Sequence, residues 1–328
     1  MHRATTPRLI WLCALLFLGG CERDQHLVEQ HLLEFGTIIQ VTMISDDLVR
    51  AESLLAGVEQ KLGQQRRQWH AWEDSDLTRF NLALQNGETV EIPGSLAPLL
   101  RLSHEYHAAS KGLFNPALGK LVAAYGFHGG GTDAQEIARI RLDVPDMRDL
   151  RVVDGQARSD NPDLQIDLGG IAKGFAVDRA ISVLKQAGVE SAIVSAGGDS
   201  RILGDHAGRP RVIGIRHPRK DGEYAAMIPL ADTAISTSGD YERFFIEDGV
   251  RFHHILNPRT GLPAGQVQSV SVLAPEAIDS DALSTTCFVL GVEDGLALVN
   301  SLETVEAIFI DSEGKLHYSH GLLQQDQP

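Results

Sequence analysis

The sequence predicts an α+β fold, with mixed, largely antiparallel sheets and inserted helices in a single domain. Short strand-like runs recur along the chain, and several are joined by tight turns such as Asp154-Gly155 and Asp248-Gly249. Segments with helical periodicity stand between these runs without regular alternation, which argues against a βαβ sheet. The 328 residues are 43% hydrophobic, enough for one large core or two abutting cores.

Residues 1–20 have the pattern of a bacterial secretory signal. Arg3 and Arg8 supply a positive region, residues 9–18 form an apolar run too short to span a bilayer, and two glycines precede Cys21. This junction resembles the lipobox of bacterial lipoproteins; the alternative is an ordinary signal peptide with an incidental cysteine. The pattern predicts a domain of residues 21–328, lipid-anchored at Cys21 on the periplasmic face of a bacterial membrane.

The elements are predicted in order from hydrophobic periodicity and turn residues. A strand over 34–44 precedes a helix that begins at Asp46 or Asp47 and ends near Gln68, and a second helix over 95–110 ends before Gly112. The apolar stripe of the first helix consists of Leu48, Ala51, Leu55, Val58 and Leu62. Further strands are predicted at 150–153, 164–168, 191–195, 211–216, 225–230, 241–246 and 250–255. Further helices are predicted at 171–187, 279–290 and 293–301, followed by a closing hairpin over 304–319.

Charge and cysteine content exclude some classes of protein. The net charge of −15 argues against a nucleic-acid partner. Cys13 lies in the predicted signal and Cys21 at the predicted lipid site, which leaves Cys287 alone, so no disulfide is predicted.

Two segments point to a divalent metal and a phosphate. In IDSDALSTT (278–286), Asp281 and Thr285 lie four residues apart, so on a helix a carboxylate and a hydroxyl share one face and can bind one hard cation. In QIDLGGIAKGFAVDRA (165–180), a strand-like run leads into two glycines and a lysine, a pattern suited to close approach of an anion at a helix start. The glycines do not form GxGxxG or a P-loop, and no HExxH occurs, so magnesium or calcium is favoured over zinc.

Several motifs in order closely resemble the ApbE family, the FAD:protein FMN transferases. They are WEDSDLTRFN (72–81), GLFNPALGKLVAAYGF (112–127), DLGGIAKGFAVD (167–178), SAGGDSRILG (195–204), STSGDYERFF (236–245), HHILNPRTGLP (253–263) and DSDALSTT (279–286). The resemblance covers essentially residues 30–320. It implies an enzyme that binds FAD as substrate with Mg²⁺, transfers FMN to a threonine or serine of an acceptor flavoprotein through a phosphoester, and releases AMP.

The resemblance also implies the metal ligands: Asp281, Thr285 and the backbone carbonyl of Gly170. A metal ion that bridges the diphosphate would neutralise its charge. The alternative for this segment is helix capping by Asp279, Ser280 or Asp281, and we favour Asp279 as the cap.

The family's FAD-contacting positions fall on Trp72, Leu113, Phe114, Asn115, Asp167, Lys173, His254 and Ile255. The alternatives are a surface ion pair for Asp167 and Lys173, and a core position for Trp72. Where the family commonly has Asp and then Thr, this chain has Asn115 and Ala117, which removes a charged contact there.

His254 is the predicted base that takes the proton of the acceptor hydroxyl, because histidine titrates near neutrality. In a regular strand His253 points to the opposite face, so only one of the two faces the site. Asp199 and Asp240 are read as residues of tight turns, and Arg243 and Arg259 as either substrate contacts or partners of core acids. Hydrolysis of FAD to FMN and AMP, and FAD binding without chemistry, remain alternatives to transfer.

Overall fold

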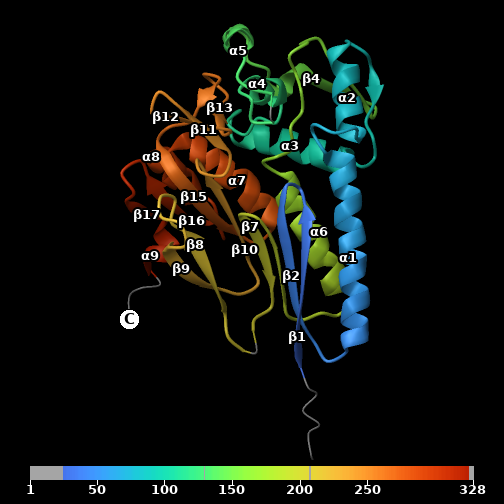
Figure 1. Cartoon of the computed structure of the whole chain (residues 1–328), viewed down its shortest axis with the longest axis vertical. Coiled ribbons are helices and arrows are strands. Elements are labelled where there is room, and N and C mark those ends of the chain that lie inside the picture. The colour runs from blue at the N-terminus through green and yellow to red at the C-terminus, as the bar shows by residue number, and fades with distance from the viewer. Residues whose placement is uncertain (1–24, 129, 207, 325–328) are drawn as a thin grey trace, which may run out of the picture.

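The computed structural model describes residues 25–128, 130–206 and 208–324. The α+β prediction is confirmed: the centre is an eight-stranded sheet in which every strand pair is antiparallel (Figure 1). In spatial order its strands are β1 (His26–Glu34), β2 (Thr37–Ser45), β6 (Ala192–Ala196), β7 (Asp199–Leu203), β10 (Ala234–Gly239), β15 (Val267–Ala274), β16 (Glu306–Asp311) and β17 (Leu316–Tyr318).

Helices pack on one face of this sheet, and a hairpin packs on the other. The helices are α1 (Leu48–Trp69), α6 (Ala172–Gln186), α7 (Ala277–Leu290) and α8 (Val292–Val299). The hairpin consists of β8 (Arg211–Arg216) and β9 (Tyr224–Leu230), and α9 (His320–Gln324) follows β17. In β7, Leu203 joins the helix-side core while its neighbour Ile202 packs under the hairpin, as side-chain alternation along a strand requires.

Smaller elements gather at one end of the sheet, at the top of Figure 1. They include the helices α2 (Asp76–Gln85), α3 (Ala97–Ala109), α4 (Gly119–Ala124) and α5 (Ala134–Ile140), and a 3₁₀ turn (Met147–Asp149). Three small sheets complete them: β3 (Val90–Glu91), β5 (Gln156–Ser159) and β4 (Leu150–Val153); β11 (Phe244–Glu247) with β12 (Val250–His253); and β13 (Leu256–Asn257) with β14 (Leu262–Pro263).

Several predicted boundaries are wrong for local reasons. The strand over 34–44 is the end of one strand and the whole of the next, because Phe35 and Gly36 form a turn with φ of 53° and 70°. The strand expected at 241–246 begins only at Phe244. Of the predicted stripe on α1, Leu48 is 48% exposed and the buried face begins at Ala51. Asp47 is the cap, and its side chain accepts from the Arg50 amide.

The strand predicted at 164–168 is absent. Its backbone instead pairs with the loop before α4: the Gly119 amide donates to the Gln165 carbonyl (2.8 Å), and the Asp167 amide donates to the Pro116 carbonyl (2.8 Å). The Asn81 side chain donates a hydrogen bond to the Ile166 carbonyl and accepts one from the Ile166 amide. These contacts fix the segment that carries Asp167.

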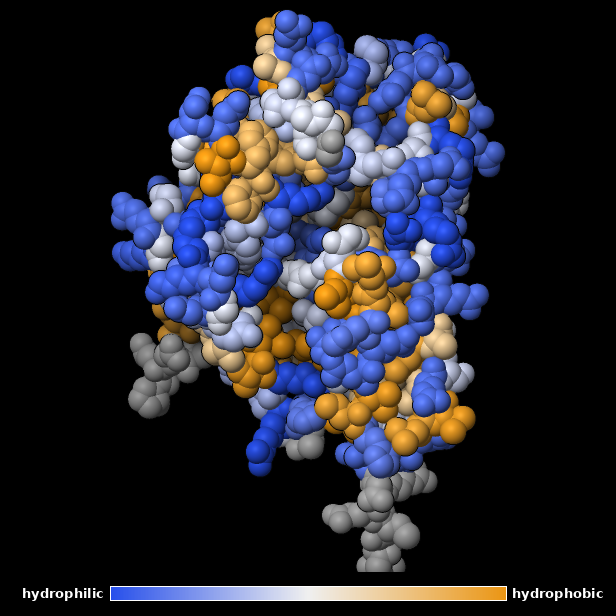
Figure 2. All heavy atoms as spheres, viewed as in Figure 1, coloured by the Kyte–Doolittle hydropathy of each residue, from blue (hydrophilic) through white to orange (hydrophobic). Residues whose placement is uncertain are grey.

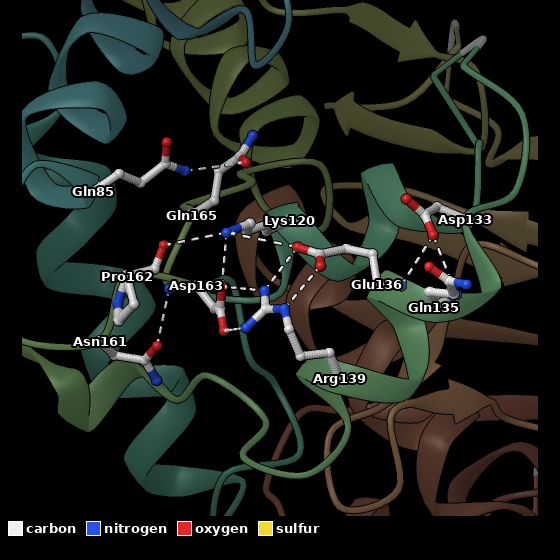
Figure 3. Close-up of polar contacts among 10 residues, drawn as sticks. All are labelled: Gln85, Lys120, Asp133, Gln135, Glu136, Arg139, Asn161, Pro162, Asp163 and Gln165. Atoms are coloured by element: carbon white, nitrogen blue, oxygen red, sulfur yellow. Dashed lines mark hydrogen bonds and ion pairs between the residues drawn. The ribbon is translucent and has the colours of Figure 1, made fainter.

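An ion-pair network holds the same segment to α4 and α5 (Figure 3). Asp163 accepts from Lys120 Nζ at 2.7 Å and from two nitrogens of Arg139 at 2.7 and 2.6 Å. Arg139 also forms a two-pronged pair with Glu136. These pairs lower the pKa of Asp163 to about 2, chiefly through the Arg139 hydrogen bonds.

The predicted signal segment and Cys21 lie outside the described residues. Within the described ranges, every helix is too short or too polar to cross a bilayer.

Candidate active site

A cavity of about 720 Å³ opens between the tip of the β1–β2 hairpin and the segments around β11 and α4, where the surface in Figure 2 is hollowed. It is lined by every sequence-predicted metal, FAD and base residue of the described chain: Trp72, Leu113, Phe114, Asn115, Asp167, Gly170, Lys173, His254, Ile255, Asp281 and Thr285. A smaller cavity of about 420 Å³ beside β8, β9 and β11 contains none of them. We therefore take the larger cavity as the candidate active site.

The metal-binding candidates lie on one face of α7. Asp281 is 3% exposed, and its Oδ2 accepts from the Gly174 amide at 3.0 Å. Burial, followed by the charge of Asp199, raises the pKa of Asp281 to about 7. A buried carboxylate with a raised pKa is a group whose charged form lacks compensation, and a bound cation would supply it.

Lys173 is committed to a neighbouring acid. Its Nζ pairs with Asp199 and lies 3.9 Å from Oδ1 of Asp281. Burial alone would lower the pKa of Lys173, but these two carboxylates outweigh it and raise the pKa. The alternative of a surface ion pair with Asp167 does not hold, because Lys173 pairs with Asp199 instead.

Glycines allow α6, α7 and the loop that precedes α6 to meet at this point. A Cβ on Gly174 would lie 2.4 Å from the Ala277 carbonyl oxygen and 2.8 Å from Asp281 Cβ. A Cβ on Gly170 would lie 3.3 Å from the Phe114 ring and 3.4 Å from Thr285 Oγ1. The Gly170 backbone thus runs beside the Thr285 hydroxyl, as its predicted role as a metal ligand requires.

The predicted capping of α7 by Asp279 is wrong. The cap comes from α6, where Asp178 accepts from the amides of Ala277 (2.8 Å) and Ile278 (2.9 Å). Asp279 instead accepts from the Tyr106 hydroxyl. Asp281 therefore does not cap the helix, and its carboxylate is left for the cavity.

Two stacked rings also line the cavity, close to Asp167. Trp72 stacks on His128 with ring centroids 3.6 Å apart and an angle of 24° between planes. His128 Nε2 lies 3.9 Å from Oδ2 of Asp167, whose Oδ1 accepts from the Gly169 amide at 2.8 Å. The side-chain amide of Asn115 is used within the protein: it donates to the Pro145 carbonyl, beyond α5, and accepts from the Ala117 amide of its own loop.

His254 lines the cavity, while His253 points away from it. His253 Nε2 bonds the Ala264 carbonyl at 2.5 Å and its ring packs edge-on against Phe288, so the predicted opposite orientations are confirmed. Nδ1 of His254 lies 3.3 Å from the Arg243 carbonyl. Because a carbonyl only accepts, Nδ1 carries the proton, and Nε2 of the neutral ring keeps its lone pair. Burial, and then the Arg243 charge, hold the pKa of His254 well below its usual value.

The four residues left open by the sequence fall into different environments. Asp199 pairs with Lys173, and Asp240 forms a two-pronged pair with Arg219 at 2.7 and 2.5 Å. Arg259 is exposed. Arg243 lines the cavity beside Gly169, and within the described part of the chain its side chain forms no ion pair.

Sequence reasoning missed His128 and Asp178. His128 lies in the glycine-rich stretch GFHGGG. These glycines were the only local signal that the side chain could face a cavity. Asp178 matched a family motif, but its capping role arises only when α6 meets α7.

The residues present fit a magnesium ion that is completed by substrate oxygens. Among the residues described, no three His, Cys, Asp or Glu side chains converge into a metal site. The donors at hand are one carboxylate, one hydroxyl and one carbonyl, all oxygens. Magnesium characteristically binds one or two carboxylates together with waters and substrate phosphates.

Comparison with known proteins agrees with this geometry. The profile of the ApbE family matches residues 35–309. A Treponema pallidum protein named FAD:protein FMN transferase is 33% identical over 340 residues, covering 96% of this chain and 94% of that protein. A Rhodobacter capsulatus protein of the same name is 36% identical over 295 residues, covering 88% of this chain but 56% of the relative's length.

The crystal structure of the ApbE protein from Thermotoga maritima superimposes with a TM-score of 0.82 at 30% identity, covering 92% of this chain and 100% of that one. A Pseudomonas stutzeri flavinyl transferase ApbE gives a TM-score of 0.80 at 31% identity, with 92% and 96% covered. Profile, sequence relatives and solved structures agree over nearly the whole described chain, and the chain belongs to the ApbE family.

Proposed function

We propose that this chain is a magnesium-dependent FAD:protein FMN transferase that attaches FMN to a threonine or serine of an acceptor flavoprotein. The observation that carries the proposal is that one cavity contains both a candidate metal site and a candidate base. An under-compensated carboxylate, Asp281, lies beside a hydroxyl and a carbonyl, and His254 offers a lone pair in the same space. The relatives named as FAD:protein FMN transferases support the same activity.

Asp281, Thr285 and the carbonyl of Gly170 would hold the magnesium ion. When bound, the ion supplies charge neutralisation to the diphosphate of FAD. Arg243, which forms no ion pair among the described residues, supplies a second positive charge at the cavity wall for the same phosphates. Trp72 and Phe114 provide flat apolar surface for the rings.

His254 accepts the proton of the acceptor hydroxyl at Nε2. The hydroxyl oxygen then bonds to the phosphorus of the FMN half, the bond from that phosphorus to the bridging oxygen breaks, and AMP leaves with the bridging oxygen. The proton remains on His254 until solvent or the leaving AMP takes it. A ring whose pKa lies well below its usual value is neutral at pH 7 and therefore ready to accept this proton.

The test is incubation of the full chain with FAD, magnesium and a candidate acceptor, followed by mass spectrometry. The acceptor should gain the mass of FMN less one water, with an equal amount of AMP, and EDTA should abolish both. The variant His254→Gln should slow transfer about 10²- to 10⁴-fold and leave FAD binding nearly unchanged. AMP and free FMN formed at one rate with and without every acceptor would replace transfer by hydrolysis. FAD binding without AMP under any condition would make the protein a carrier.

We further propose that the chain is anchored by lipid at Cys21 to the periplasmic face of a bacterial membrane. The support is the run of arginines, apolar residues and small residues that precedes this cysteine. Cys21→Ser should release the protein from the membrane fraction or block its processing. Membrane retention equal to that of the unmodified chain would reject the anchor.

A further inference from the structure

His128 lies in the cavity on a loop rich in glycine. Gly126 and Gly131, with φ of 81° and 74°, and Gly130 flank it, so the backbone can carry the side chain inward. The imidazole packs face to face on Trp72 at 3.6 Å. The stack fixes the plane of the histidine ring, and with it the direction of its nitrogen atoms.

Nε2 of His128 is buried and has no hydrogen-bond partner. Other residues of the described chain also have a buried side-chain atom without a hydrogen-bond partner, but none of them lines the cavity. They are Gln65, Ser103, His104, Arg211, His253, Gln268 and Ser269. An unpaired buried polar atom costs free energy, so such atoms are few in native proteins. One that faces a substrate cavity is accounted for by a partner on the substrate.

Oδ2 of Asp167 lies 3.9 Å from this nitrogen, too far for a direct hydrogen bond. Burial lowers the pKa of His128 to about 4, more than the Asp167 charge raises it, so the ring is neutral at pH 7. A neutral imidazole nitrogen and a carboxylate oxygen thus stand side by side at the cavity wall. Together they match the edge of a heteroaromatic ring on which donor and acceptor atoms alternate.

We propose that His128 is a specificity residue for FAD, whose Nε2 hydrogen-bonds the polar edge of one of its two ring systems next to Asp167. Both the isoalloxazine and the adenine carry such an edge, with ring nitrogens beside carbonyl or amino groups. Trp72 acts here as the positioning residue that holds the imidazole plane. This inference rests on the proposed function for the identity of the ligand.

The test is equilibrium binding of FAD, FMN and AMP, each titrated separately into the full chain with EDTA present so that no turnover occurs. His128→Phe keeps a ring on Trp72 but removes the nitrogen, and FAD binding should weaken about tenfold. His128→Gln, which retains a polar end, should recover part of the loss. A loss for FMN with AMP unchanged identifies the isoalloxazine as the ring, and the reverse pattern identifies the adenine.

The matched control is His104→Phe, because Nε2 of His104 is also buried and unpaired but lies outside the cavity. This variant should bind all three ligands as the unmodified chain does. Equal affinity of His128→Phe and the unmodified chain for all three ligands overturns the inference, and so does an equal loss in the control. If the unmodified chain binds FAD but transfers nothing, the proposed function fails while this test still decides the role of His128. If it binds no FAD at all, both fall.

Discussion

Two clusters of lysine, arginine and acids in this molecule use the same chemical groups with opposite results. In the network of Figure 3, Lys120 and Arg139 meet Asp163 and Glu136, two cations for two acids. In the cavity, Lys173 alone faces both Asp199 and Asp281. The Arg139 hydrogen bonds chiefly lower the pKa of Asp163 to about 2, whereas burial, and then the charge of Asp199, raise the pKa of Asp281 to about 7.

The difference shows how a binding site is distinguished from a structural contact of similar composition. Asp163 is satisfied by its own chain and has nothing further to bind. Asp281 is buried one positive charge short, so its ionised form costs free energy until a cation arrives. The balance of cations and acids in each cluster therefore distinguishes the metal candidate, although both clusters consist of ion pairs.

The largest expected effect is a loss of turnover when Asp281 loses its negative charge. Asp281→Asn preserves size and an oxygen that can accept from Gly174 but removes the negative ligand. Release of AMP from FAD with magnesium should fall by at least about 100-fold. The matched variant Asp163→Asn should lose far less activity, because Asp163 lies outside the cavity and only helps to hold the segment that carries Asp167. Undiminished turnover of Asp281→Asn at saturating magnesium would remove this residue from the site.

A smaller effect is expected one turn along the same helix. Thr285→Ala deletes a neutral ligand, so turnover should fall about tenfold and recover partly at higher magnesium. The measurement is the magnesium dependence of AMP release. If Thr285→Ala is as damaging as Asp281→Asn, charge is not what separates the two positions.

The third expectation concerns the stability of the metal-free protein as a function of pH. A carboxyl whose pKa is raised in the folded state binds a proton there that the unfolded chain has released between about pH 4 and 7. This contribution to the free energy of unfolding therefore falls as pH rises through that window. Asp281→Asn should remove the decline and stabilise the metal-free protein at pH 7 on the order of 1 kcal/mol. Urea titrations in EDTA at several pH values decide this, and a destabilised variant would contradict it.

The smallest effect is expected in the satisfied cluster, with the opposite sign. Asp163 has a depressed pKa, so its contribution to stability is present above about pH 4 and is lost as pH falls toward 2. Asp163→Asn should destabilise the fold at pH 7 by less than about 1 kcal/mol, because Arg139 is half exposed to solvent. A stability gain in this variant at neutral pH would erase the contrast between the clusters.

The sequence predicted elements whose pattern is local and missed those shaped by distant neighbours. The periodic helices α1, α6 and α7 were found close to their true bounds, and the turns at Asp154-Gly155 and Asp248-Gly249 were placed correctly. The strand β15 was not predicted, although Ser269-Val270-Ser271-Val272 alternates polar and apolar residues; in the structure both of its faces are buried, serines included.

The candidate site followed the same rule. The family motifs identified Asp281 and Thr285, and the helix between them made their shared face predictable. The partner of Lys173 was not predictable, because Asp199 arrives from β7 through the fold of the sheet. Likewise the capping of α7 by Asp178 depends on the contact between two helices and not on any local sequence.

The close contact at Gly174 makes the cavity depend on the docking of α6 against α7. The Gly174 amide and the Asp281 carboxylate are 107 positions apart in sequence, and no side chain fits between their helices. An unfolded or partly folded chain that has not brought α6 against α7 lacks the buried carboxylate beside its glycine and hydroxyl. If Asp281 holds a divalent cation as proposed, stabilisation by that cation should appear only in molecules whose two helices have docked.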